Sequence, residues 1–167
     1  DVNYAGKNPD DVSVTNVDNE TASITVSALS GNTTEMGGTA TFNVVLDSQP
    51  TSDVSIAVSS SDTSEATISP SSLTFGGSNY STLQTVTVTG VDDFYDDDNV
   101  SYTITVDPSS SITSYNTITS STITGYNTDN DKATITVGAK SGNTSEFGTT
   151  ATINVTLATI STAIVCI

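Results

Sequence analysis

Apolar and polar residues alternate with a period of two along most of the chain, a pattern that is typical of β-strands with one buried face. Phe42, Val44 and Leu46 mark one such run, and segments rich in Gly, Pro, Asp and Ser separate the runs. No apolar rhythm of 3.6 residues is long enough for a helix. The pattern predicts strands over residues 22–29, 38–46, 53–59, 65–68, 82–91, 99–106 and 117–126.

About seven short strands in a little over a hundred residues predict an all-β fold. The expected architecture is an antiparallel β-sandwich of the immunoglobulin-like type, in which two sheets cover one core. The abundance of Thr beside Val and Ile fits this class, because β-branched residues pack well on a pleated sheet that is wet on one face.

A long internal repeat sets the expected domain organisation. The segment 22–46 (ASITVSALSGNTTEMGGTATFNVVL) returns at 133–157 as ATITVGAKSGNTSEFGTTATINVTL, 111 residues later. The chain is therefore predicted to be a window on a tandem array. It would hold the closing strand and linker of one repeat (residues 1–20), a complete sandwich (21–131) and the first strands of an incomplete repeat (132–167).

Charge and composition exclude several functions. The net charge of -16, with only three Lys and Arg residues together, opposes binding to nucleic acid and to anionic membranes. The absence of histidine removes Ser-His-Asp and Cys-His catalysis and imidazole metal ligands. No run approaches the roughly 20 apolar residues of a membrane span. We therefore expect neither an enzyme nor membrane insertion.

Nine of the nineteen acidic residues fall in turns that an antiparallel sandwich brings to one pole. These turns are the first, third and fifth connections and the end of the last strand, and they contain Glu35, Asp62, Asp92, Asp93, Asp96, Asp97, Asp98, Asp129 and Asp131. Clustered carboxylates repel one another and need a cation. Hard oxygen ligands in this number are what Ca²⁺ takes. The alternative is that they are solvated turn residues, since Asp is common in turns.

The turn sequences resemble those of the Calx-beta domain, a β-sandwich family that binds Ca²⁺. The similar segments are EMGGTATF (35–42), SSDT (60–63), VDDFYDDDN (91–99) and DND (129–131). The ligands that the resemblance implies are Glu35, Asp62, Asp92, Asp93, Asp96, Asp129 and Asp131, and Asp98 completes the predicted set. The resemblance also places metal at the junction between tandem domains, where Asp18 and Glu20 would close the preceding repeat.

These features together predict a structural or adhesive module of an extracellular or cell-surface protein, stiffened by Ca²⁺ between its repeats. The expected partners are neighbouring repeats of the same chain or of identical chains, with a cell-surface or matrix ligand as a further candidate. The alternative is a subunit of a self-assembling filament, in which incomplete sandwiches exchange strands.

Overall fold

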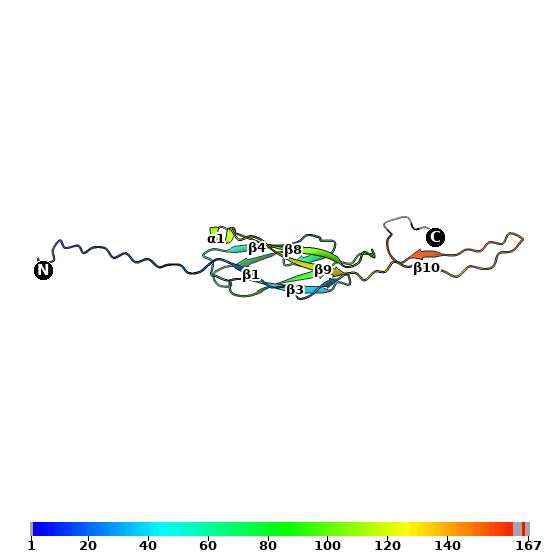
Figure 1. The fold of residues 1–167 in the computed structure, drawn as a ribbon, viewed down its shortest axis with the longest axis horizontal. Coiled ribbons are helices and arrows are strands. Elements are labelled where there is room, and N and C mark those ends of the chain that lie inside the picture. The colour runs from blue at the N-terminus through cyan, green and yellow to red at the C-terminus, as the bar shows by residue number, and fades with distance from the viewer. Residues whose placement is uncertain (1, 162–164, 166–167) are drawn as a thin grey trace.

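The alternating segments form two β-sheets that face each other in the centre of the molecule (Figure 1). The computed structural model describes residues 2–161 and 165. The first sheet has the strand order β1 (Ile24–Val26), β3 (Thr39–Leu46), β7 (Gln84–Gly90) and β5 (Ala66–Ser69). The second has the order β2 (Thr33–Thr34), β9 (Ser121–Thr128), β8 (Val100–Ser110), β4 (Val54–Ser60) and β6 (Ser72–Phe75). This arrangement confirms the predicted all-β, immunoglobulin-like sandwich.

The core lies between the sheets and is built from every second residue of the longer strands. In β3, Phe42, Val44 and Leu46 are buried, and from the facing sheet Tyr102 and Ile104 of β8 meet them in one apolar cluster. The polar residues between these positions point outward. The period of two therefore describes the real burial, and the apolar contacts across the sheets stabilise the fold.

Two short strands and one helical turn were not predicted. Strand β6 pairs with β4, so the chain leaves the first sheet after β5 and returns to the second. Only Leu73 and Phe75 are buried in β6, which is too short a run to signal a strand. The predicted last strand begins at Ser121 rather than at residue 117, because α1 (Thr113–Asn116) precedes it and buries Tyr115.

The C-terminal part of the described chain forms a separate hairpin of β10 (Ile135–Val137) and β11 (Val155–Leu157). Its register repeats that of β1 and β3: Ile24 pairs with Leu46, and Ile135 pairs with Leu157. Backbone hydrogen bonds beyond the strands recur as well, since Ser27 N–Asn43 O returns as Gly138 N–Asn154 O. The sequence repeat is thus also a repeat of local structure.

The segment before the sandwich does not form the closing strand that was predicted within residues 1–20. Residues 8–20 are extended and carry no strand in the described part of the chain, while residue 1 lies outside it. Their counterpart, β9, is held by β2 on one side and β8 on the other. No such neighbours lie beside residues 8–20 among the described residues, which explains the lack of a ladder.

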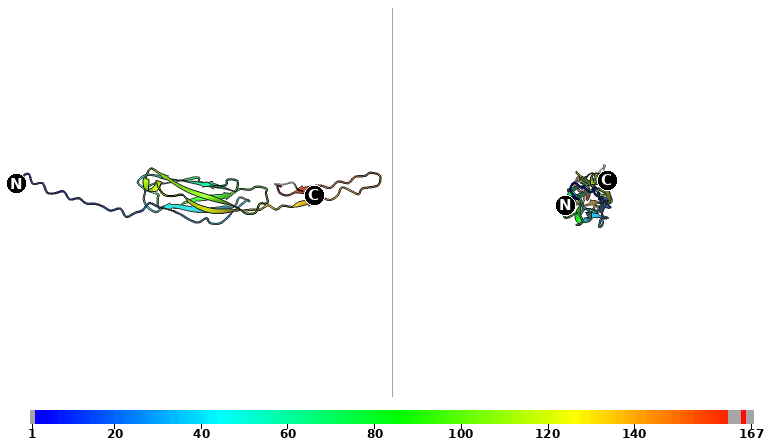
Figure 2. Two further views of the ribbon diagram at one scale, coloured as in Figure 1. Left: turned by 45° about the horizontal axis from the view of Figure 1, so that its top comes forward. Right: turned by 90° about the vertical axis from the view of Figure 1, so that its left-hand side faces the viewer.

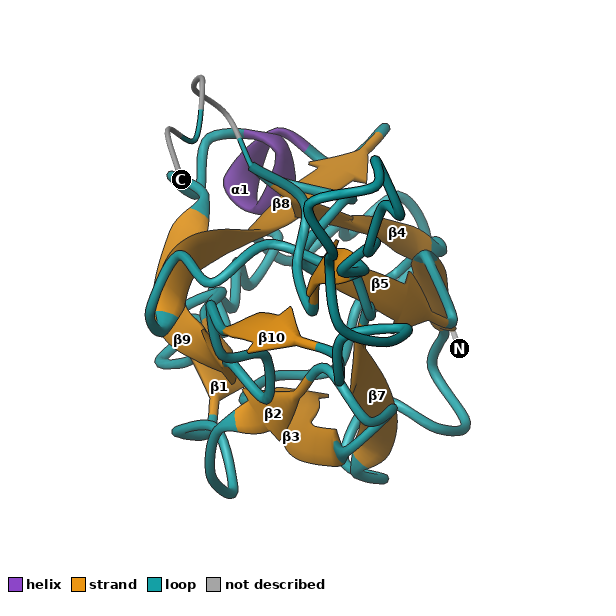
Figure 3. Ribbon diagram, turned by 90° about the vertical axis from the view of Figure 1, so that its right-hand side faces the viewer, coloured by secondary structure: helices purple, strands orange, loops and turns teal. Residues whose placement is uncertain are grey.

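The segment and the hairpin leave the sandwich from opposite ends, as two views show (Figures 1 and 2). Seen along the long axis from the hairpin side, β8 and β4 of the second sheet lie above β3 and β7 of the first (Figure 3). No helix in the described part of the chain is long and apolar enough to cross a membrane. The organisation into tandem repeats stays a prediction, and the end of its third segment, residues 162–164 and 166–167, lies outside the described residues.

Candidate metal centre

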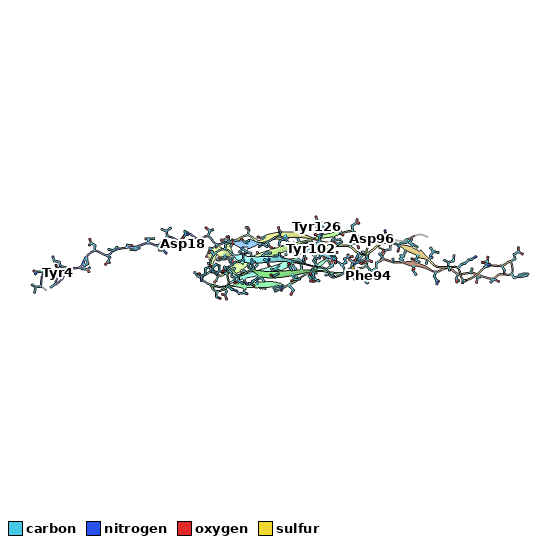
Figure 4. The ribbon with its side chains drawn as sticks, turned by 90° about the horizontal axis from the view of Figure 1, so that it is seen from below. Tyr4, Asp18, Phe94, Asp96, Tyr102 and Tyr126 are labelled. Atoms are coloured by element: carbon cyan, nitrogen blue, oxygen red, sulfur yellow. The ribbon has the colours of Figure 1, made fainter. Side chains whose placement is uncertain are left out.

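The acidic turns meet at the end of the sandwich that faces the hairpin. Asp96 and Phe94 lie at this end in Figure 4, whereas Asp18 lies at the other. Among the described residues, two groups of three carboxylates form here, and within each group the nearest oxygens are all within 4.8 Å of one another. We call this end the acidic pole. Its two triads are Glu35, Asp129 and Asp131, and Glu65, Asp93 and Asp97.

The first triad depends on the parallel pairing of β2 with β9. Thr34 lies opposite Thr128, so the residues that follow the two strands, Glu35 and Asp129, emerge side by side. Glu35 is 2% exposed, and its Oε2 accepts a hydrogen bond from Asn130 N at 2.9 Å. Asp131 N donates to Asp129 Oδ1 at 2.6 Å. A strand only two residues long therefore brings together groups that are 94 residues apart.

The second triad contains two residues outside the predicted ligand set, Glu65 and Asp97. Glu65 is 6% exposed and immediately precedes β5. Its carbonyl accepts from Val91 N at 2.9 Å, which holds it beside the loop of Asp93 and Asp97. The prediction placed Glu65 inside a strand, so its carboxylate was not counted with the turn acids. The sequence feature that points to a turn position is that Glu65 is the first residue of the predicted strand 65–68, next to the preceding turn.

The other predicted ligands belong to neither triad, and all of them except Asp18 and Glu20 lie at or near the acidic pole. Asp62 forms a local turn by accepting hydrogen bonds from Ser64 N and Oγ. Asp92 accepts from the Asn130 side chain at 3.2 Å, and Asp96 accepts from Ala133 N at 2.7 Å. Asp98 N donates to Asp129 Oδ2 at 3.2 Å. Asp18 and Glu20 line a hollow at the opposite end of the sandwich, together with residues of the 47–51 turn.

The pKa values of several carboxyls at the acidic pole are raised. Burial is the main cause for Glu35 and Glu65, and nearby carboxylates, Asp129 for Glu35 and Asp97 for Glu65, add to it. The pKa values of Asp97 and Asp131 are raised in the same way, first by desolvation and then by neighbouring acids. The pKa of Asp62 is instead lowered by its bonds to Ser64. The pole is thus a place where negative charge is costly without a cation.

A buried network of polar side chains holds the Glu65 carboxylate in place. The Asn127 side chain, 1% exposed, donates from Nδ2 to Val91 O at 2.9 Å and to Glu65 Oε2 at 3.3 Å. Its Oδ1 accepts a 3.0 Å hydrogen bond from the hydroxyl of Thr33, which also bonds Tyr102. Every polar atom here is satisfied, as buried groups require. The network joins both sheets' ends to the carboxylate and fixes its position.

The chemistry of this donor set fits a hard divalent cation. Each triad offers three carboxylate oxygens, and oxygen is the ligand type that Ca²⁺ prefers. Zinc and copper favour nitrogen or sulfur, and the sequence has no histidine. Residues able to hold such an ion are the two buried glutamates and the aspartates that share their triads.

Comparisons with known proteins give no family for this chain, and the solved structures that it resembles are distant in sequence. No family model matches the chain, and no curated protein matches it. Among solved structures, SSP-19, an MSP-domain-like protein of Caenorhabditis elegans, is 14% identical over 60% of this chain and 94% of its own (TM-score 0.43). The E. coli chaperone DraB is 11% identical over 66% of this chain and 57% of its own, with a TM-score of 0.48. A PapD-like domain of human CEP192 is 15% identical over 74% of this chain and 99% of its own, with a TM-score of 0.41.

Proposed function

We propose that this chain is a Ca²⁺-binding β-sandwich repeat of an extracellular or cell-surface protein with a structural or adhesive role. The observation that carries the proposal is the pair of carboxylate triads, each built around a buried glutamate at one pole. Burying ionised carboxylates side by side opposes folding unless a cation neutralises them. Ca²⁺ supplies that charge and accepts six to eight oxygen ligands.

The position of the triads supports a role in stiffening the junction between repeats. Asp131 belongs to the first triad, and Ala133, two residues on, opens the following copy and donates to Asp96. An ion bound by residues 129 and 131 would fix the start of this short linker to the acidic pole. Because an ordered junction would bind the ion better than a mobile one, ion binding would favour a single orientation of the two neighbouring repeats.

The exposed hairpin favours a second candidate, a filament subunit that completes its sandwich with strands of another copy. Ile135, Val137 and Leu157 are 48%, 63% and 46% exposed, whereas their counterparts Ile24, Val26 and Leu46 pack on or in the core. An exposed apolar face of this kind is expected to be buried by other residues, either later residues of the same repeat or those of another chain. The mass of the native polypeptide separates the two, since an array requires several multiples of the repeat.

Calorimetric titration with Ca²⁺ tests the main proposal directly. The chain should bind Ca²⁺, and a variant with Glu35→Gln and Glu65→Gln should lose most of the heat. Small-angle scattering in Ca²⁺ and in EGTA then tests the mechanical role, with a wider distribution of lengths expected in EGTA. Binding without any change in dimensions would refute the stiffening role, and no binding at all would refute the metal site.

A further inference from the structure

The loop of residues 92–98, between β7 and β8, contacts the following copy of the repeat as well as its own sandwich. Ala133 N donates to Asp96 Oδ2, and Ile160 N donates to Phe94 O, each at 2.7 Å. These two contacts come from separate parts of the following copy, the residues just before β10 and the turn after β11. The loop therefore lies against a surface that the repeat itself provides.

Subtracting the repeat length of 111 residues gives the equivalent surface on the central sandwich. Ala133 corresponds to Ala22, and Ile160 corresponds to Gln49. In the central sandwich these two residues line a hollow of about 560 Å³ at the pole opposite the acidic one. The apolar part of its wall comes from Pro50, Tyr80, Ile112 and Tyr115. The position that loop 92–98 occupies on the following copy is thus an open hollow on the central sandwich.

We propose that successive repeats dock head to tail, with loop 92–98 of one repeat seated in this hollow of the next. The proposal rests on the tandem array of the proposed function. The loop presents two aromatic side chains, Phe94 and Tyr95, which are 61% and 37% exposed. Aromatic side chains anchor interfaces when they enter a pocket lined by apolar and aromatic groups. The preceding repeat would supply such an anchor to the hollow of the central sandwich.

Charge makes this docking depend on the cation. The loop carries five aspartates, at positions 92, 93, 96, 97 and 98, and the rim of the hollow carries Asp18, Glu20 and Asp47. Like charges oppose the approach of the two surfaces when no metal is bound. Ca²⁺ at the triads neutralises the loop, so the ion and the docked arrangement favour each other.

The test uses a chain in which residues 57–131 are appended after Ile167. Because residues 132–167 repeat residues 21–56, this chain completes a second sandwich, and the first shows that one repeat closes its own core. Phe94→Ala is introduced either in the first repeat or at the equivalent position in the second. The second-repeat variant is the matched control, since its loop has no following neighbour.

Limited proteolysis of the junction in Ca²⁺ gives the readout. The first-repeat variant should be cleaved about tenfold faster than the unmodified chain, or more, as expected for losing one buried aromatic contact. The control should match the unmodified chain. Equal cleavage of the two variants would overturn the docking proposal even if calorimetry shows Ca²⁺ binding. If Ca²⁺ does not bind, the same comparison at high salt, which screens the acids, decides docking separately.

Discussion

Replacing Glu35 with glutamine should change the stability of the protein in opposite directions with and without Ca²⁺. Glu35 is almost fully buried, and an oxygen of its carboxylate lies within 4.8 Å of an oxygen of Asp129. Two unit charges at that separation repel by about 3 kcal/mol at an effective dielectric constant of about 20. Solvent and salt at the half-buried Asp129 reduce the repulsion to about 1 kcal/mol.

Glu35→Gln removes this charge but keeps an oxygen that can accept the hydrogen bond from Asn130 N. In EGTA the variant should therefore be more stable than the unmodified protein by about 1 kcal/mol, or several degrees in melting temperature. Ca²⁺ at about 100 times its dissociation constant should stabilise the unmodified protein by about 2.7 kcal/mol. The variant should gain little of this, so the order of stability reverses.

Urea or thermal denaturation followed by circular dichroism, in EGTA and in Ca²⁺, measures both effects. Asp107→Asn is the control, because Asp107 is an exposed acid in β8 outside both triads. It should leave the stabilisation by Ca²⁺ unchanged. A Glu35→Gln variant that is less stable in EGTA, or that keeps the full response to Ca²⁺, would refute the electrostatic reasoning.

Three further predictions concern the acidic pole and its support. The two buried glutamates have pKa values raised above 4.5, so the folded protein binds their protons more tightly than the unfolded chain does. The melting temperature in EGTA should therefore rise as the pH falls from neutral toward 4.5. A melting temperature that falls over that range would contradict this prediction. Thr33→Val leaves Asn127 Oδ1 without its donor and should destabilise the fold by about 1–3 kcal/mol in urea denaturation, more than Thr122→Val on the exposed face of β9. Gly90→Ala would drive its Cβ into Thr34 O and the Asn127 amide and should lower the melting temperature, whereas Gly31→Ala, with open space around it, should not; equal effects would argue against close packing there.

Much of the fold could be predicted from the chain because burial follows local alternation. Phe42, Val44 and Leu46 are apolar at every second position, so they share one face of a strand, and that face is the one that packs on the core against the facing sheet. The strands that the sequence did not predict lack this alternation. Strand β6 has only two buried residues, and β2 is two residues long, so neither carries a periodic signal of its own.

The sequence alone determined the sandwich class, the 111-residue repeat and the convergence of acidic turns on one pole, since these depend on strand order and on residue types. Only the tertiary structure decided which carboxylates meet. It grouped Glu65 with Asp93 and Asp97 and left Asp62 in a local turn. The physical reason is that oxygens must lie within a few ångströms to share an ion, and that distance is set by pairings between strands far apart in the chain, which no local pattern encodes.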